Sequence, residues 1–105
     1  MIRHCVFVRF RPEVERHERD AILADIVALK QRLSGIQAVH LGANVSPEAG
    51  MDKGFSEGFI VDFRDAAARD AYLVDPAHQA AGARLVAAAD GGIAGILVYD
   101  LEIPA

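Results

Sequence analysis

The stretch DAYLVDPAHQ, residues 70–79, decides how the second half of this chain folds. Pro76 cannot continue a helix from the residues before it, but it suits the first turn of a new helix, for which Asp75 is a good N-cap. The sequence therefore predicts two helices with a break between them. Side chains six positions apart on one continuous helix lie about 600° apart around its axis. The break instead allows Tyr72 and His78 to converge.

Strand patterns flank this break on both sides. Residues 2–10 alternate, with Ile2, His4, Val6, Val8 and Phe10 on one face. Helical periodicity follows over residues 15–33, where large aliphatic side chains recur at helical spacing. The full predicted order is strand 2–10, helix 15–33, strand 36–45, loop 44–54, strand 55–63, helices 65–73 and 75–89, and strand 96–103. This βαββαβ order with a broken second helix predicts a ferredoxin-like α+β sandwich: a four-stranded antiparallel sheet with helices on one face.

The last strand predicts a homodimer. Its two faces are both apolar, with Leu97, Tyr99, Leu101 and Ile103 on one side and Ile96 and Val98 on the other. Because the helices cover only one face of the sheet, a monomer would expose a large apolar patch on the other. Packing two sheets face to face across a two-fold axis would cover it.

Composition limits the class of protein further. The chain has 105 residues, a formal net charge of -4 and a single cysteine, Cys5. This length suits one domain, residues 1–105, and the scattered basic residues argue against nucleic acid as a partner. One cysteine excludes an internal disulfide, and its place in a strand predicts a buried, unreactive thiol. We see no signal peptide and no apolar run of the ~20 residues that a membrane helix needs, so we expect a soluble cytoplasmic protein with no membrane partner.

Several motifs, in order and with matching gaps, resemble one known family. They are MIRH (1–4), FRP (10–12), GANVS (42–46), VDFRD (61–65) and AYLVDPAHQ (71–79). Together they are similar to the stress-responsive dimeric α/β-barrel (Dabb) domain. The resemblance implies a ferredoxin-like protomer and a dimer whose two sheets form a barrel.

The same resemblance implies possible activities. Some family members are stress-associated proteins that build stable oligomers, and one plant branch is a polyketide cyclase that closes a ring by aldol condensation without a cofactor. That branch relies on the tyrosine and histidine that match Tyr72 and His78, with the histidine that matches His4 lining the same pocket.

This chain departs from the family pattern at three positions. Asp75 replaces the first histidine of the usual His-Pro-x-His motif. Aliphatic residues such as Ile26 stand where the cyclase branch has a tyrosine on the first helix, and Glu57 stands where that branch has a histidine on the third strand. The pocket chemistry of the cyclase is thus reproduced only in part.

The residue types themselves suit proton transfer. A histidine with an ordinary pKa near 6.5, here His78, can act as a general base near neutral pH. Tyr72 can donate a hydrogen bond to a carbonyl or a developing enolate, with His4 in support. Each also has a structural reading. His78 can bond to neighbouring backbone or to a cap, and Tyr72 can be a packing residue with its hydroxyl at the rim. His4 can be a core histidine with its hydrogen bonds satisfied.

Three hypotheses of function follow. The first is a homodimeric stress-response protein that binds a small hydrophobic metabolite in a pocket between sheet and helices. The second is a cofactor-free, polyketide-cyclase-like lyase with His78 as base and Tyr72 as donor, and the third is a purely structural oligomer. No cofactor or metal is expected, because no His-x-x-x-His spacing occurs, although Asp75 and His78 could share an ion at i, i+3. Tyr72→Phe and His78→Ala would separate the three hypotheses.

Overall fold

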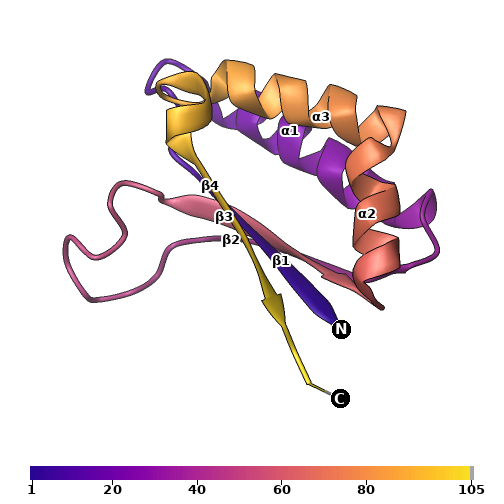
Figure 1. Ribbon diagram of the computed structural model, residues 1–105. Coiled ribbons are helices and arrows are strands. Elements are labelled where there is room, and N and C mark those ends of the chain that lie inside the picture. Colours follow the sequence, from indigo (N-terminus) through magenta and orange to yellow (C-terminus); the bar gives the residue numbers. More distant parts are fainter. Residues whose placement is uncertain (105) are drawn as a thin grey trace.

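The computed structural model describes residues 1–104, and in it all helices lie on one face of a four-stranded antiparallel sheet (Figure 1). The strand order β2-β3-β1-β4 places the two terminal strands side by side. This is the predicted ferredoxin-like α+β fold, broken second helix included. The elements are β1 (Ile2–Val8), α1 (Arg16–Ala28), η1 (Leu29–Gln31), β2 (Ile36–Ala43), β3 (Glu57–Phe63), α2 (Ala66–Val74), α3 (Pro76–Ala88), η2 (Gly92–Gly95) and β4 (Ile96–Glu102).

Several of the predicted strands and helices were longer than the elements in the structure. The first strand ends at Val8 rather than Phe10, because the Arg9 amide turns to donate to the Gly95 carbonyl and Phe10 makes only an isolated bridge with Ala89. The first helix changes to a 3-10 turn at Leu29, which stays buried. The loop between β2 and β3 covers 44–56, so both neighbouring strands are shorter than predicted.

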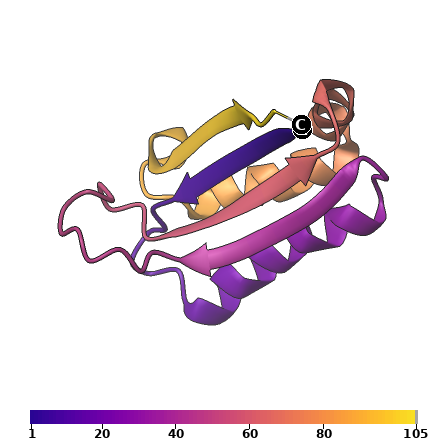
Figure 2. The same cartoon turned by 90° about the horizontal axis from the view of Figure 1, so that it is seen from below.

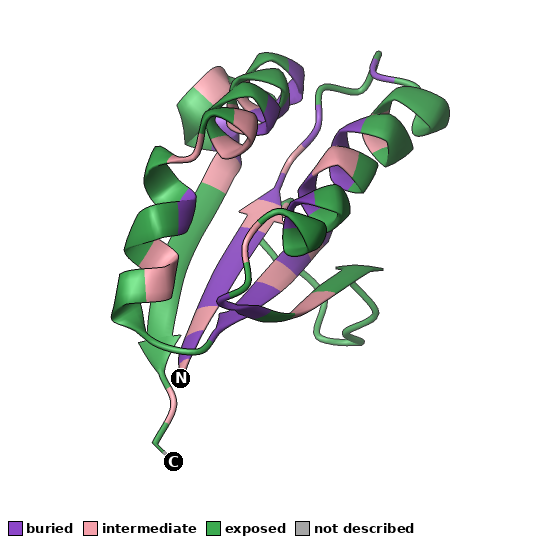
Figure 3. Ribbon diagram, turned by 90° about the vertical axis from the view of Figure 1, so that its right-hand side faces the viewer, coloured by how far each residue is buried: buried purple, intermediate pink, exposed green. Residues whose placement is uncertain are grey.

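The core lies between the sheet and the helices, where the buried residues of Figure 3 gather. The alternation predicted for β1 is confirmed, since Val6 and Val8 point into this core. Phe59, Val61 and Phe63 of β3 pack beside them. The helices contribute mainly Ile22, Ile26, Leu29, Tyr72, Ala81 and Leu85.

The other face of the sheet carries no helix (Figure 2). We call it the open face. Strand register places Phe7, Ile60, Leu97, Tyr99 and Leu101 on it. The last three are 43–46% exposed, so the predicted apolar patch is present on a single chain.

Polar groups sit at one end of the open face. Asp62 is buried, accepts two hydrogen bonds from Arg3 and lies 3.3 Å from the His40 ring nitrogen. The hydrogen bond from Arg3 lowers the pKa of Asp62, against the effect of burial. Cys5 is buried as predicted, and burial raises the pKa of its thiol.

Candidate functional site

Tyr72 stands at the centre of the predicted site. It lies on the side of α2 that faces the sheet, and it is only 1% exposed. Its ring packs edge to face against Phe63, with centroids 4.9 Å apart, and against His4, with centroids 5.7 Å apart. The tyrosine ring is therefore part of the hydrophobic core, as its structural reading predicted, but its hydroxyl is buried and does not lie at the rim of the core.

The break between α2 and α3 brings His78 against Tyr72. The Asp75 carboxylate caps α3 by accepting hydrogen bonds from the amides of Ala77 and His78, and Pro76 occupies the first helical position. His78 thereby faces back toward the end of α2. Its ring centroid lies 4.0 Å from that of Tyr72. The convergence predicted for this pair is present in the structure.

The two side chains share an unusual feature: each buries a polar atom with no partner. Among residues 1–104, neither the Tyr72 hydroxyl nor His78 Nδ1 has a hydrogen-bond partner. Buried polar side-chain atoms are nearly always satisfied, and leaving one unsatisfied costs roughly 1–3 kcal/mol. Two such groups in contact therefore destabilise the fold unless another molecule forms hydrogen bonds with them.

Burial sets the protonation of this pair. It raises the pKa of Tyr72 well above its ordinary value, so the hydroxyl keeps its proton. Burial lowers the pKa of His78 below its ordinary 6.5, with a smaller electrostatic contribution from the neighbouring His4; a hydrogen bond to the Leu73 backbone and the Asp75 carboxylate oppose this shift without cancelling it. At neutral pH the site thus holds a phenol that donates and a neutral imidazole that can accept a proton.

His4 is the third predicted residue, and it completes the group. It lies in β1, 5% exposed, with its ring next to Tyr72. Its Nδ1 is 2.7 Å from an oxygen of Asp100, and the other oxygen of Asp100 is 2.6 Å from Arg69 of α2.

Asp100 and Arg69 were missed by sequence reasoning. A signal for Asp100 was present, because it alternates with Ile96 and Val98 on the side of the last strand that faces the helices. No comparable signal marks Arg69, which is one of the two charged residues of α2.

Comparison with known proteins fits this geometry. The model of the stress responsive A/B barrel domain family (Dabb) matches residues 2–103. The chain belongs to this family. No curated protein sequence matches significantly.

Solved structures with the same fold as this Dabb domain include proteins described as dimeric. A dimeric ferredoxin-like protein of unknown function from Jannaschia sp. CCS1 is 35% identical, with a TM-score of 0.89 over 97% of this chain and 98% of that one. A Dabb family protein from Mesorhizobium loti is 23% identical, with a TM-score of 0.75 over 99% and 97%. A hydroxynitrile lyase from Passiflora edulis is 20% identical, with a TM-score of 0.85 over 98% and 93%.

Two positions where this Dabb domain departs from the cyclase pattern have structural roles. Glu57 is buried and paired with Arg16 and Arg19, so it ties α1 to the start of β3. Ile26 is 2% exposed and packs in the core.

No metal site is indicated among residues 1–104, where no three His, Cys, Asp or Glu side chains group in a way that could hold an ion. The Asp75 carboxylate, considered above as half of a two-residue ion site, is bonded instead to the α3 amides and to Arg32. No helix in this part of the chain is both long and apolar enough to cross a membrane.

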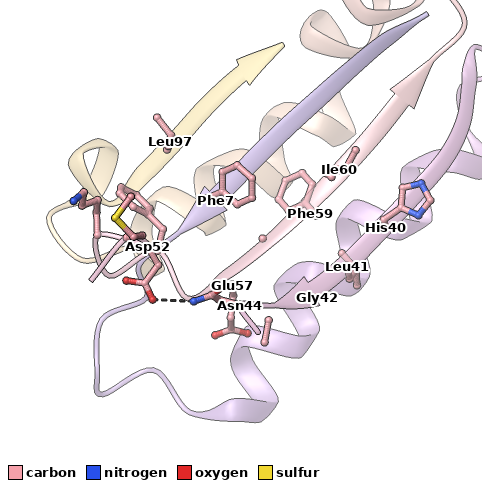
Figure 4. A pocket seen from close by; sticks show the side chains of 15 residues that line it. Phe7, His40, Leu41, Gly42, Asn44, Asp52, Glu57, Phe59, Ile60 and Leu97 are labelled. Carbon is pink, nitrogen blue, oxygen red and sulfur yellow. Dashed lines mark hydrogen bonds between the residues drawn. The ribbon is translucent and has the colours of Figure 1, made fainter. Parts of the chain in front are cut away.

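A hollow of about 540 Å³ lies elsewhere, on the open face (Figure 4). Phe7, Ile60 and Leu97 line it, and the loop 44–56 forms one wall. None of Tyr72, His78 and His4 lines it. This hollow is thus on the side of the sheet that we expect a second copy to cover, not between sheet and helices.

Proposed function

We propose that this Dabb protein is a homodimer in which each protomer binds a small, largely apolar molecule through Tyr72, His78 and His4. The observation that carries the proposal is the contact between the rings of Tyr72 and His78, each of which buries a polar atom, the Tyr72 hydroxyl and His78 Nδ1, without a partner among residues 1–104. Such atoms suit a ligand that offers one acceptor and one donor. The aromatic and aliphatic surroundings suit a ligand that is otherwise apolar.

A carbonyl compound that enolises matches this pattern. Its carbonyl oxygen accepts from the Tyr72 hydroxyl, and its enol hydroxyl donates to an imidazole nitrogen. A β-diketone such as benzoylacetone carries both groups on an apolar frame, so it is a suitable probe.

The test is a titration with benzoylacetone, followed by isothermal calorimetry and by two-dimensional NMR of the backbone amides. We expect binding to wild type, with shifts centred on α2 and the start of α3. Tyr72→Phe and His78→Ala should each weaken binding at least tenfold, about 1.4 kcal/mol.

Matched controls for this titration are available in the chain. Tyr99→Phe removes the hydroxyl of the other tyrosine, which lies on the open face, and His17→Ala removes an exposed imidazole. Both should bind as wild type does. If a panel of enolisable carbonyl compounds and hydroxynitriles leaves the spectrum unchanged, the binding proposal is wrong and the structural-oligomer hypothesis gains.

A second candidate function is a cofactor-free lyase or cyclase at the same site. It is favoured by the protonation of the pair, because a neutral His78 can remove a proton from the carbon next to a carbonyl while Tyr72 stabilises the enolate oxygen. The shared fold with a hydroxynitrile lyase supports testing hydroxynitriles as substrates. In mandelonitrile cleavage the base takes the hydroxyl proton, the bond to the nitrile carbon breaks, and cyanide leaves as hydrogen cyanide, so the released benzaldehyde reports turnover. Turnover that both Tyr72→Phe and His78→Ala abolish would favour this candidate over simple binding.

A further inference from the structure

His4 differs from its two neighbours in the site because one of its ring nitrogens, Nδ1, already has a hydrogen-bond partner. Asp100 lies directly opposite His4 in the register of β1 and β4, and its Oδ1 is 2.7 Å from His4 Nδ1. Its second oxygen is 2.6 Å from Nη1 of Arg69, whose Nε also donates to Asp70 at 2.8 Å. A continuous polar chain thus runs from α2 through β4 to the buried ring in β1.

This chain determines where the proton of His4 sits. An ionised carboxylate only accepts hydrogen bonds, so the short contact requires a proton on Nδ1. Burial raises the pKa of Asp100, but the hydrogen bonds from His4 and Arg69 outweigh it and leave that pKa below its ordinary value. In the neutral ring, a proton on Nδ1 leaves Nε2 as the acceptor.

The same contact fixes the orientation of the ring. The His4 imidazole stands edge to face with Phe63, at 6.0 Å between centroids, and with Tyr72, at 5.7 Å. With Nδ1 tied to β4, the ring cannot flip without breaking a charge-assisted hydrogen bond in a buried position. The orientation of a buried histidine is commonly set by the hydrogen bond that its other nitrogen makes.

We propose that Asp100, held in place by Arg69, is a positioning residue for His4: it keeps the proton on Nδ1 and presents Nε2 as a hydrogen-bond acceptor at the Tyr72–His78 site. The inference deepens the proposed function and rests on it for the role of the site in binding. It also specifies the ligand: Nε2 of His4 accepts from a hydroxyl or enol group, while the Tyr72 hydroxyl donates to a carbonyl.

The decisive test reads the tautomer of His4 without any ligand. Long-range ¹H–¹⁵N NMR of the imidazole at pH 8, where an ordinary histidine is neutral, distinguishes protonated from unprotonated ring nitrogens. In wild type we expect Nδ1 of His4 in the protonated range and Nε2 in the unprotonated range. In Asp100→Leu the two signals should move toward each other's ranges, whereas Asp100→Asn, whose side-chain carbonyl can still accept, should keep the wild-type pattern.

A matched control lies two residues further along β4. Glu102 is an exposed acid on the same side of the strand, so Glu102→Leu removes a similar charge without touching His4. This variant should keep the wild-type tautomer. Asp100→Ala serves as a second variant should Asp100→Leu fail to fold, and the two ring-nitrogen signals should move in the same way. A wild-type ring protonated on Nε2, or a tautomer that no variant changes, would overturn the proposal in favour of a purely structural ion pair.

Binding of benzoylacetone separates this inference from the proposed function. We expect Asp100→Leu to weaken binding at least tenfold, and Asp100→Asn and Glu102→Leu to stay within threefold of wild type. If the tautomer follows Asp100 but wild type binds no carbonyl compound, the proposed function fails while the positioning of His4 stands. If wild type binds benzoylacetone but the variant with the changed His4 tautomer binds it equally well, the positioning role fails and the binding site stands.

Discussion

Tyr72 combines near-complete burial with an unpartnered hydroxyl, and this predicts that removing the hydroxyl makes the protein more stable. Most buried tyrosines lose a hydrogen bond when they are changed to phenylalanine, but this one has none to lose. We expect Tyr72→Phe to raise the free energy of unfolding by about 1 kcal/mol in urea denaturation. Tyr99→Phe, at an exposed position, should change it by less than about 0.5 kcal/mol. A Tyr72→Phe protein that is less stable than wild type would show that the hydroxyl is satisfied after all.

The lowered pKa of His78 predicts how stability depends on pH. Because burial keeps the folded-state pKa below the unfolded value near 6.5, the unfolded chain binds the proton more readily. The contribution of His78 to the free energy of unfolding is therefore fully present above pH 6.5, and it is lost as the pH drops through 6.5 toward the folded-state pKa. The hydrogen bond from Arg3 keeps the pKa of Asp62 below its usual range, so that carboxylate titrates below this window.

Denaturation between pH 8 and 5 measures this effect. We expect His78→Leu to lose less stability over that range than wild type does. His17→Leu, at an exposed position, should follow the wild-type curve. Parallel curves for wild type and His78→Leu would contradict the assignment.

At the scale of elements, the cap of α3 positions the site. Asp75 accepts from two α3 amides and pairs with Arg32, so it fixes both the start of the helix and the place of His78. We expect Asp75→Ala to lower Tm by about 4–8 °C, the usual effect of losing an N-cap in a domain of this size. Asp75→Asn, which retains an accepting oxygen, should recover most of the loss and so separate the cap from the ion pair. Equal Tm values for wild type and Asp75→Ala would show that Pro76 alone starts the helix.

These elements also show what the sequence could predict. The helix break and its cap were predictable because Asp75 and Pro76 act on their immediate neighbours, and the face of β1 was predictable because alternation is local. The strand ends at Val8 and Glu57 were not, since they depend on where Arg9 and the loop 44–56 meet distant backbone.

The hydrogen-bond partner of His4 could not be predicted from the sequence either. The His4–Asp100 contact joins residues 96 positions apart, and it exists only because β1 pairs with β4 in one register. A single sequence shows that Asp100 shares a face with Val98, but not which residue of β1 lies opposite. The predicted pocket between sheet and helices stays a prediction, while the hollow that the structure does contain depends on the path of the loop 44–56.

For the whole molecule, the open face is the surface on which a single chain leaves large apolar side chains exposed. Leu97, Tyr99 and Leu101 stand in a row along an edge strand, each nearly half exposed, and neighbouring structures with this fold are described as dimeric. Covering such a row with a second copy removes apolar surface from water, which is the main favourable term in association.

A pair of variants on β4 tests this assembly. Leu97 lies on the open face and Val98, the next residue, lies on the opposite side of the same strand, at 43% and 52% exposure. We expect wild type and Val98→Glu to sediment as dimers at micromolar concentration. Leu97→Glu should raise the dimer dissociation constant more than tenfold, because a dimer joined through the open face would bury two unpaired carboxylates. Both substitutions add the same charge to the same strand, so a difference between them reports the face used. A dimer that survives Leu97→Glu but not Val98→Glu would place the interface on the helix side of β4 instead.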